Sequence, residues 1–290
     1  MAFAVASETS QQRHWHRFRY LLRRHFPIFV GAAILLVLSA AALLAPWIVG
    51  DPIKFNPIDR LQTPGADHWF GTDQFGRSVL NRTVHGGRVS LIVGLSVAAL
   101  STVIGLTIGL VSGYVRSIDM VVMRVMDGLL AIPHILLAIA LVSLTHATIQ
   151  NVIIAVTVAE VPRVVRLVRG VVLTIREQPY VDAAVTVGSR TPKIIFRHIL
   201  PNTIAPLMVQ STFICASAII IESALSFLGA GTPPEIPSWG GTIAEGRSYF
   251  QLAPWIIFFP GACLALLILS INLVGDGLRD MIDPRIARSI

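Results

Sequence analysis

The sequence has little charge, very few lysines and almost no cysteine. Only 13% of its 290 residues are Asp, Glu, Lys or Arg, whereas 54% are hydrophobic. Soluble domains carry roughly 25% charged residues, so the composition predicts an integral membrane protein. Cys215 and Cys263 both lie in apolar runs and form no CxxC or metal-ligand spacing. They therefore predict no metal site and say nothing about the redox compartment.

Patterns for nucleotide binding and catalysis are also missing. The P-loop pattern GxxxxGK[ST] is absent, and neither of the two lysines, Lys54 and Lys193, follows a glycine-rich turn. GxSxG, HExxH and histidine-rich clusters are absent too, and His14 and His16 belong to a polar tail. We therefore predict that the chain is not an enzyme and binds no cofactor or metal itself. Energy for any active transport would come from an ion gradient or from a partner.

Long apolar stretches are abundant. Six of them are long enough for a transmembrane helix, which needs about 20 residues. They cover residues 27–49, 89–115, 121–144, 149–173, 204–228 and 254–274. The first exceeds the roughly 7–15 residues of a signal-peptide core and follows a long basic tail, so we expect it to stay as an anchor. The predicted fold class is all-α integral membrane with six transmembrane helices.

The basic residues between these stretches predict the orientation, because cytoplasmic loops are enriched in them. Six of the 23 lie on one side, namely Lys54, Arg60, Arg77, Arg82, Arg88 and Arg247. The other 17 lie in the two terminal tails, the second-to-third turn and the fourth-to-fifth connection. We therefore expect both termini in the cytoplasm. The basic residues flank membrane spans and form no basic–aromatic stacking surface, which argues against nucleic-acid binding.

The connection over residues 177–201 is strongly polar and contains helix signals. Pro179 suits a first helical position, and residues 180–187 can follow as one or two turns. Gly188 can then end the helix in the left-handed conformation. This pattern predicts the first arm of a helical hairpin on the cytoplasmic side.

A second short helix is expected directly afterwards. Thr191 offers an N-cap hydroxyl and Pro192 a first-turn position for a helix over residues 193–200, which Pro201 would close. A loop between membrane spans rarely needs a folded hairpin unless a partner docks there. The hairpin is therefore predicted to be a docking element.

The polar segment 51–88 lies on the side opposite the hairpin. Asp73 precedes a periodic apolar run, which predicts a short amphipathic helix at the membrane interface; the run consists of Phe75, Val79, Leu80 and Val84. The segment forms either a spacer over the membrane or a surface for an external partner.

Small residues recur along the second apolar stretch, at Gly105, Gly109 and Gly113. Glycines four residues apart allow another helix to approach closely. The neighbouring helix belongs either to the same chain, which we favour, or to another subunit.

Three acidic residues lie in or near the apolar stretches. A charge at the bilayer centre costs about 2.5–3.5 kcal/mol, so such residues usually face a cavity or a partner. Asp127 is expected to pair with Arg124 on the helix surface. Glu160 either pairs with Arg163 at a kink or lines a cavity. Glu222 is a candidate for lining a translocation path or supporting its gate.

The hairpin resembles the EAA loop of ABC importer permeases, in which EAA is followed by three residues, Gly, nine residues and I-x-L-P. The matching residues are Asp182, Ala183, Ala184, Gly188, Ile199, Leu200 and Pro201. Asp182 stands where that family has Glu. His198 stands where it has Ile, with Ile199 one place further on.

Other segments resemble the C-type permeases of dipeptide, oligopeptide and nickel transporters. They are Gly71-Thr72-Asp73 with Gly76-Arg77 and Gly87-Arg88-Val89-Ser90-Leu91, the segment 222–229 with Pro233-Pro234 and Pro237-Ser238-Trp239-Gly240, and the segment 272–280 with Asp283-Pro284. Together the resemblance covers the chain from about residue 15 to its end and implies a type I ABC importer permease fold.

The resemblance implies a division of labour. Such a permease pairs with a homologous B-type permease and binds two cytoplasmic ATPase subunits, which hold ATP and Mg. A periplasmic or lipid-anchored binding protein delivers a small solute, most often a di- or oligopeptide. The hairpin would be the coupling helix seated on an ATPase, in a chain of the bacterial cytoplasmic (inner) membrane.

The expected organisation follows from these assignments. It comprises a cytoplasmic tail (1–26), a first membrane helix (27–50), a periplasmic segment (51–88), a five-helix core (89–275) with the hairpin at 177–201, and a C-terminal cytoplasmic tail (276–290).

Two other functions fit part of the sequence. A gradient-driven secondary transporter would predict inverted repeats and paired broken helices near the midplane, which the sequence does not display. A non-transporting membrane scaffold would explain a docking hairpin but gives no reason for Glu222.

Overall fold

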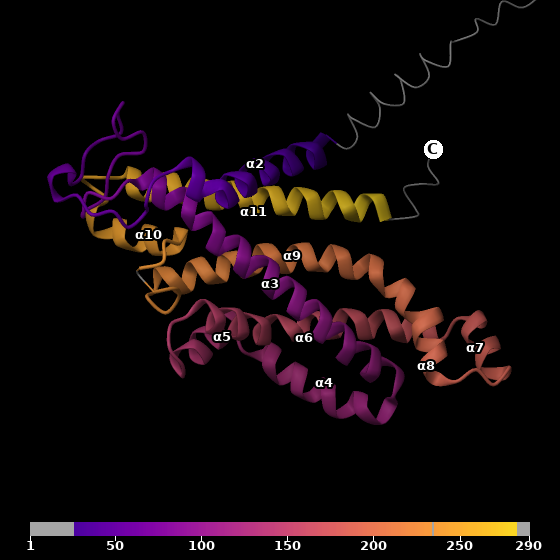
Figure 1. Cartoon of the computed structure of the whole chain (residues 1–290). Helices are drawn as coiled ribbons and strands as arrows, with labels where there is room; N and C mark the ends of the chain where they lie inside the picture. The colour runs from indigo at the N-terminus through magenta and orange to yellow at the C-terminus, as the bar shows by residue number, and fades with distance from the viewer. Residues whose placement is uncertain (1–25, 234, 283–290) are drawn as a thin grey trace, which may run out of the picture.

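The computed structural model describes residues 26–233 and 235–282, and this part of the chain is mainly helical (Figure 1). The long helices are α2 (Phe26–Ile48), α3 (Val79–Tyr114), α6 (Ile149–Arg176), α9 (Leu200–Phe227) and α11 (Trp255–Ile282). The short ones are α4 (Arg116–Ala131), α5 (His134–Ser143), α7 (Pro179–Thr186), α8 (Thr191–Ile194) and α10 (Trp239–Gly246). Most of the two predicted tails, including His14 and His16, lies outside the described residues.

The helices form an elongated bundle with different elements at its two ends. Figure 1 shows α7 and α8 at one end, which we call the hairpin end, and α10 with the segment 51–78 at the other, the α10 end. Helices α2 and α11 run side by side, and α3 packs against both α6 and α9. The first turn of α2 and the last turn of α11 both point toward the hairpin end.

The membrane-spanning potential of the helices agrees only in part with six predicted spans. Four helices are long and apolar enough to cross a membrane, namely α2, α3, the continuous segment Thr191–Phe227 and α11. A fifth span is possible if α4 and α5 together count as one. Helix α6 is continuous over 28 residues but is not in this group. Its sequence contains Glu160 and several arginines.

The third predicted span is wrong as a single straight helix. Helices α4 and α5 meet at an angle of 90°. Pro133 lies at the break and offers no backbone N–H, and it disfavours helical geometry in the residue before it. Ile132 is accordingly extended, with φ −91° and ψ 127°.

The short interfacial helix expected after Asp73 is also wrong as a separate element. Helix α3 begins at Val79, behind the N-cap of Ser78, and continues without a break into the second apolar stretch. Val79 is fully buried. Leu80 and Val84 of the predicted run are half-buried and Phe75 stays exposed, so the run as a whole forms no separate amphipathic face. Burial of Val79 inside the protein stabilises the start of α3 instead.

The second arm of the hairpin differs from its prediction in two ways. Thr191 is the first helical residue, and Arg190 takes the N-cap position without a side-chain hydrogen bond. Pro201 does not end the arm, because it directly follows a π-helical turn, and such a local adjustment accommodates a proline within a continuous helix. The five π-helical residues Ile195–Ile199 join α8 to α9, so the chain stays helical throughout.

The glycine stripe of α3 lies against α6 of the same chain. A Cβ added to Gly105 would approach the Cβ of Val164 to 2.4 Å, and one added to Gly109 would approach that of Val168 to 2.7 Å. Gly113 has the same relation to Val172, also at 2.7 Å. The glycines thus allow two helix backbones to pack closely.

We expect Gly109→Ala to destabilise the protein by about 1–3 kcal/mol, because the added methyl group overpacks the contact between α3 and α6. Gly170→Ala is the matched control, since nothing lies within 4 Å of a Cβ added there. Thermal unfolding in detergent measures both variants. Equal midpoints for the two variants would contradict this packing.

Candidate functional site

The turn of the hairpin is built around a left-handed glycine. Gly188 has φ +82° and follows Val187, the C-cap residue of α7. Its N–H donates to the carbonyl oxygen of Val185 at 2.9 Å, and the N–H of Ser189 donates to that of Ala184 at 3.0 Å. These two bonds form a Schellman motif, which satisfies the last carbonyl groups of α7 and reverses the chain.

The hairpin is held to the bundle by apolar side chains that face inward. Val181, Ile194 and Ile199 are buried and belong to the main hydrophobic core. The rings of Tyr180 and His198 lie 6.0 Å apart and connect the two arms. The hairpin is therefore a folded part of the protein with a defined orientation.

The motif residues fall into two structural groups. Asp182, Ala183 and Pro201 are exposed, and Ala184 and Leu200 are half-buried. Ile199 is buried and Gly188 forms the turn. Only part of the motif is thus available to a partner.

Sequence reasoning missed an apolar surface on the hairpin. The exposed fractions are 85% for Val187, 67% for Phe196, 53% for Val185 and 46% for Tyr180. Large apolar residues inside an otherwise polar loop were the available signal. Large apolar side chains that stay exposed on a folded element are a feature of protein-interaction sites. We call these four residues the hairpin apolar surface.

Glu160 is buried at the contact between α6 and α9. Its Oε2 accepts a hydrogen bond from Nη1 of Arg163 at 3.0 Å, and its Oε1 accepts one from the hydroxyl of Ser217 at 2.7 Å. Glu160 is fully buried, whereas the Arg163 side chain is 41% exposed. The carboxylate is satisfied and the guanidinium extends to the surface.

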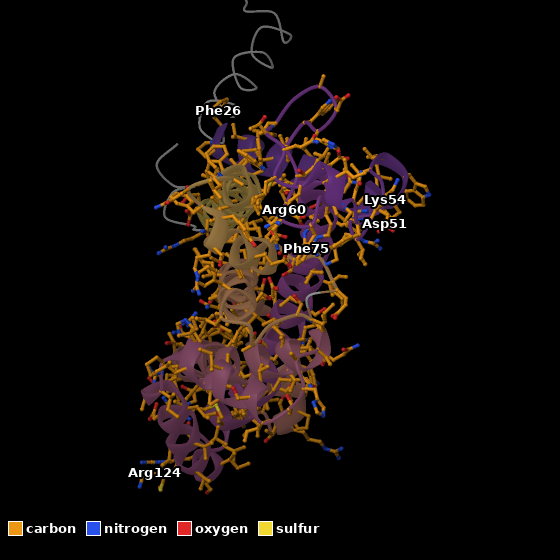
Figure 2. All side chains as sticks on the ribbon, turned by 90° about the vertical axis from the view of Figure 1, so that its left-hand side faces the viewer. Phe26, Asp51, Lys54, Arg60, Phe75 and Arg124 are labelled. Carbon is orange, nitrogen blue, oxygen red and sulfur yellow. The ribbon has the colours of Figure 1, made fainter. Side chains whose placement is uncertain are left out.

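The partner predicted for Asp127 is wrong. Its Oδ1 accepts a hydrogen bond from Nη2 of Arg166 at 2.6 Å, which links α4 to α6. Arg124 is exposed and lies at the periphery of the bundle (Figure 2). A second pair missed by sequence reasoning, Asp119 with Arg169, connects the same two helices. The bend between α4 and α5 returns α4 to α6, so tertiary packing overrides the local pair.

Glu222 begins a chain of hydrogen bonds that reaches the α10 end. Its Oε1 accepts a hydrogen bond from the hydroxyl of Ser226 at 2.8 Å. The Oγ of Ser226 in turn accepts a hydrogen bond from the N–H of Thr232 at 3.2 Å. The hydroxyl of Thr232 donates to that of Ser238 at 3.1 Å, and Ser238 caps α10. Glu222 is fully buried. This series of hydrogen bonds therefore connects α9 to the segment before α10.

We expect Ser226→Ala to cost about 1–3 kcal/mol, because it leaves buried partners of that hydroxyl unsatisfied. Ser211→Ala is the matched control in the same helix, since the hydroxyl of Ser211 only bonds back to the carbonyl of Met208. The measurement is the unfolding midpoint of each purified variant. If Ser226→Ala lowers the unfolding midpoint no more than Ser211→Ala does, the stabilising role assigned to these hydrogen bonds is refuted.

A four-charge cluster closes the α10 end. Arg77 pairs with Asp73 at 2.6 Å and also with Glu245, while Arg82 pairs with Glu245 at 3.0 Å and lies 3.8 Å from Asp73. The side chains of Asp73 and Arg82 are almost completely buried. Two guanidinium groups and two carboxylates give no net charge. The cluster joins the segment before α3 to α10.

Two tryptophans reinforce the same end of the bundle. Trp239 Nε1 donates to the carbonyl oxygen of Thr83 at 2.7 Å, and Trp255 Nε1 donates to that of Thr72 at 3.0 Å. Trp239 belongs to α10 and Trp255 to α11. Both therefore tie the α10 end to α3 and the segment preceding it.

The described chain has a cavity of about 740 Å³ between the end of α2, the segment 51–78 and the start of α3. Its lining includes Asp51, Lys54 and Trp69. Figure 2 places Asp51 and Lys54 close together at the surface. Among the described residues, no group of three or more His, Cys, Asp or Glu side chains could hold a metal ion.

Comparison with known families places these features in context. A family model described as the binding-protein-dependent transport system inner membrane component matches residues 101–288. The chain belongs to this family. It is a permease subunit of an ABC importer, a multi-pass membrane protein that is not itself an enzyme.

Several relatives of this permease are similar over nearly their whole length. The "Probable peptide ABC transporter permease protein" of Sinorhizobium fredii is 54% identical over 268 residues, which cover 92% of each chain. The dipeptide transport system permease protein of Alkalihalophilus pseudofirmus is 41% identical, over 93% of this chain and 90% of that one. The glutathione transport system permease protein of Pectobacterium atrosepticum is 36% identical, over 97% and 95%.

The permease also resembles a solved importer structure. A chain in the inward facing conformations of the MetNI methionine ABC transporter matches with a TM-score of 0.54 and 19% identity. The match covers 72% of this permease and 95% of that chain. The two chains therefore share a fold.

Proposed function

We propose that this permease forms half of the translocation path for di- or oligopeptides and couples to a separate ATPase that docks on the hairpin over residues 177–201. The complex would contain two ATPase subunits, which would hold ATP and Mg. A homologous B-type permease would complete the path, and a periplasmic or lipid-anchored binding protein would deliver the peptide. The complex would lie in the cytoplasmic (inner) membrane of a bacterium.

The observation that carries this proposal is the hairpin apolar surface. Val187 and Phe196 are large apolar side chains that lie exposed on an element whose other side is buried in the core. Interfaces take most of their energy from a few such residues seated in pockets of the partner. The chain has no P-loop pattern of its own. An ATPase on another chain explains both features.

The proposed topology has six membrane spans with both termini in the cytoplasm. Helix α6 and the bent pair α4 and α5 would complete the four apolar spans. The basic residues of the tails, and those at the end of α6 and in the connection after it, support this orientation; in that connection they are Arg176, Arg190, Lys193 and Arg197. In it, the hairpin end faces the cytoplasm, and the α10 end, with the segment 51–88, faces the binding protein.

The peptide specificity is proposed from the relatives named for peptide, dipeptide and glutathione transport. Copurification followed by transport tests the function. The permease should copurify with an ATPase pair and a second permease, and the complex in proteoliposomes should import dipeptides with ATP and its binding protein. Uptake that persists without ATP, or stops when the proton gradient alone is dissipated, would refute the proposal.

A further inference from the structure

The Arg163 side chain on α6 has unused hydrogen-bonding capacity. A guanidinium carries five N–H donors, and within the described chain this one makes a single hydrogen bond, to Oε2 of Glu160. Glu160 is fully buried and is also held by Ser217 of α9. The side chain is 41% exposed, so it has donors left for a ligand.

The packing of α3 on α6 indicates how deep in the membrane the Arg163 guanidinium lies. Each glycine of the α3 stripe lies against a valine 59 positions later, namely Val164, Val168 and Val172, so the two helices run parallel. The apolar run of α3 is bracketed by Arg88 and Arg116. The midpoint of this run is residue 102, and the position on α6 that lies beside it, 59 residues later, is Val161. Arg163 is two residues further on, about 3 Å along a helix with a 1.5 Å rise per residue.

A cation so close to the middle of the membrane cannot face lipid at low cost. Its exposure to hydrocarbon costs about 2.5–3.5 kcal/mol. The same face of α6 continues with Arg166, which is 56% exposed, and its partner Asp127 on α4 is 59% exposed. These charges therefore face water or another protein.

We propose that Arg163 faces the translocation path near the middle of the membrane and binds a carboxylate group of the passing solute. This inference rests on the proposed function. The planar guanidinium fork matches a carboxylate, and Glu160 with Ser217 fixes its orientation. Because Glu160 already offsets part of the charge, the solute carboxylate binds weakly enough to leave. A di- or oligopeptide offers this group at its C-terminus.

The first experiment tests whether the position is water-lined. Arg163→Cys is made in a Cys215→Ala/Cys263→Ala background and reconstituted as the full complex. A membrane-impermeant sulfonate methanethiosulfonate reagent should modify it, and dialanine with the binding protein should slow the reaction. Leu95→Cys is the control, because Leu95 is exposed on the uncharged run of α3. If the reagent fails to modify the cysteine at position 163 in every nucleotide state, the inference is overturned, whatever the transported solute.

The second experiment tests the carboxylate. Uptake of dialanine and of dialanine amide is compared at a saturating concentration of loaded binding protein. We expect the wild-type complex to favour dialanine by about tenfold, as a charge-assisted hydrogen bond implies. Arg163→Gln should reduce this ratio to about one, and Arg88→Gln should leave it unchanged.

The double variant Glu160→Gln/Arg163→Gln separates carboxylate binding from a structural role. It removes the buried carboxylate that Arg163→Gln leaves without its cation. We expect its uptake ratio to stay near one. Restoration of the wild-type ratio would mean that Arg163 only neutralises Glu160, and would overturn the inference. A wild-type complex without ATP-driven uptake would refute the proposed function, and the cysteine experiment would still decide the position of Arg163.

Discussion

Gly188→Val should reduce ATP-driven uptake by at least about 30-fold while leaving membrane insertion intact. A β-branched residue at φ +82° is strongly disfavoured, so the turn between α7 and α8 has to open. The two arms that carry Val187 and Phe196 would then lose their fixed relative orientation. Loss of one interface hot spot of about 2 kcal/mol weakens binding roughly 30-fold. The measurements are retention of the ATPase subunits in a pull-down and uptake in proteoliposomes.

Gly188→Asn is the matched control for this effect. Asparagine tolerates the left-handed conformation far better than valine and commonly replaces glycine at helix ends. The Asn variant should therefore keep most of its uptake. Asp182→Lys, which reverses an exposed charge on α7, should uncouple transport without unfolding the hairpin. Wild-type uptake and substrate-stimulated ATPase activity in both Gly188→Val and Asp182→Lys would sink the docking role.

Arg82→Met should destabilise the permease by about 3–5 kcal/mol, which corresponds to a decrease of roughly 10 °C in the apparent Tm. Asp73 and Glu245 would keep only Arg77 as a cation, and Asp73 is almost completely buried. Removing one partner of a buried ion pair leaves an uncompensated charge, which costs more than the pair contributed. Thermal unfolding at low and high salt gives the measurement, and the loss should change little with salt because buried pairs are screened weakly.

Arg88→Met serves as the control, since it removes the same charge from an exposed position on the same helix. We expect a change of about 0.5 kcal/mol or less there. Adding Glu245→Gln to Arg82→Met should recover part of the lost stability, because it removes one orphaned carboxylate. Strictly additive losses in the double variant would show that Arg82 and Glu245 do not interact.

Much of the fold was predictable because its signals are local. The apolar runs that became α2, α9 and α11 follow from length and hydropathy, and the left-handed Gly188 follows from the steric freedom of glycine. The bend between α4 and α5 was also indicated locally, because Pro133 lies there and proline interrupts a helix. Length alone favoured one straight span there, and that reading was wrong.

The candidate site was predictable only in outline. The hairpin and its motif were located, but Val187 and Phe196 stood out only when their exposure was known. Asp127 was assigned the arginine nearest in sequence, whereas its partner lies 39 positions away on α6. Local spacing describes neighbours on one helix and carries no information about which other helix approaches it.

The sequence by itself determined that this is an all-helical membrane protein with a folded polar hairpin. Those properties depend on composition and on residues close together in the chain. Only the tertiary structure decided which polar and charged groups meet across different helices. Arg82 meets Glu245 across 163 positions, and Ser217 meets Glu160 across 57. A buried charge is tolerated when a partner arrives from another element, and only the packing of the helices brings that partner.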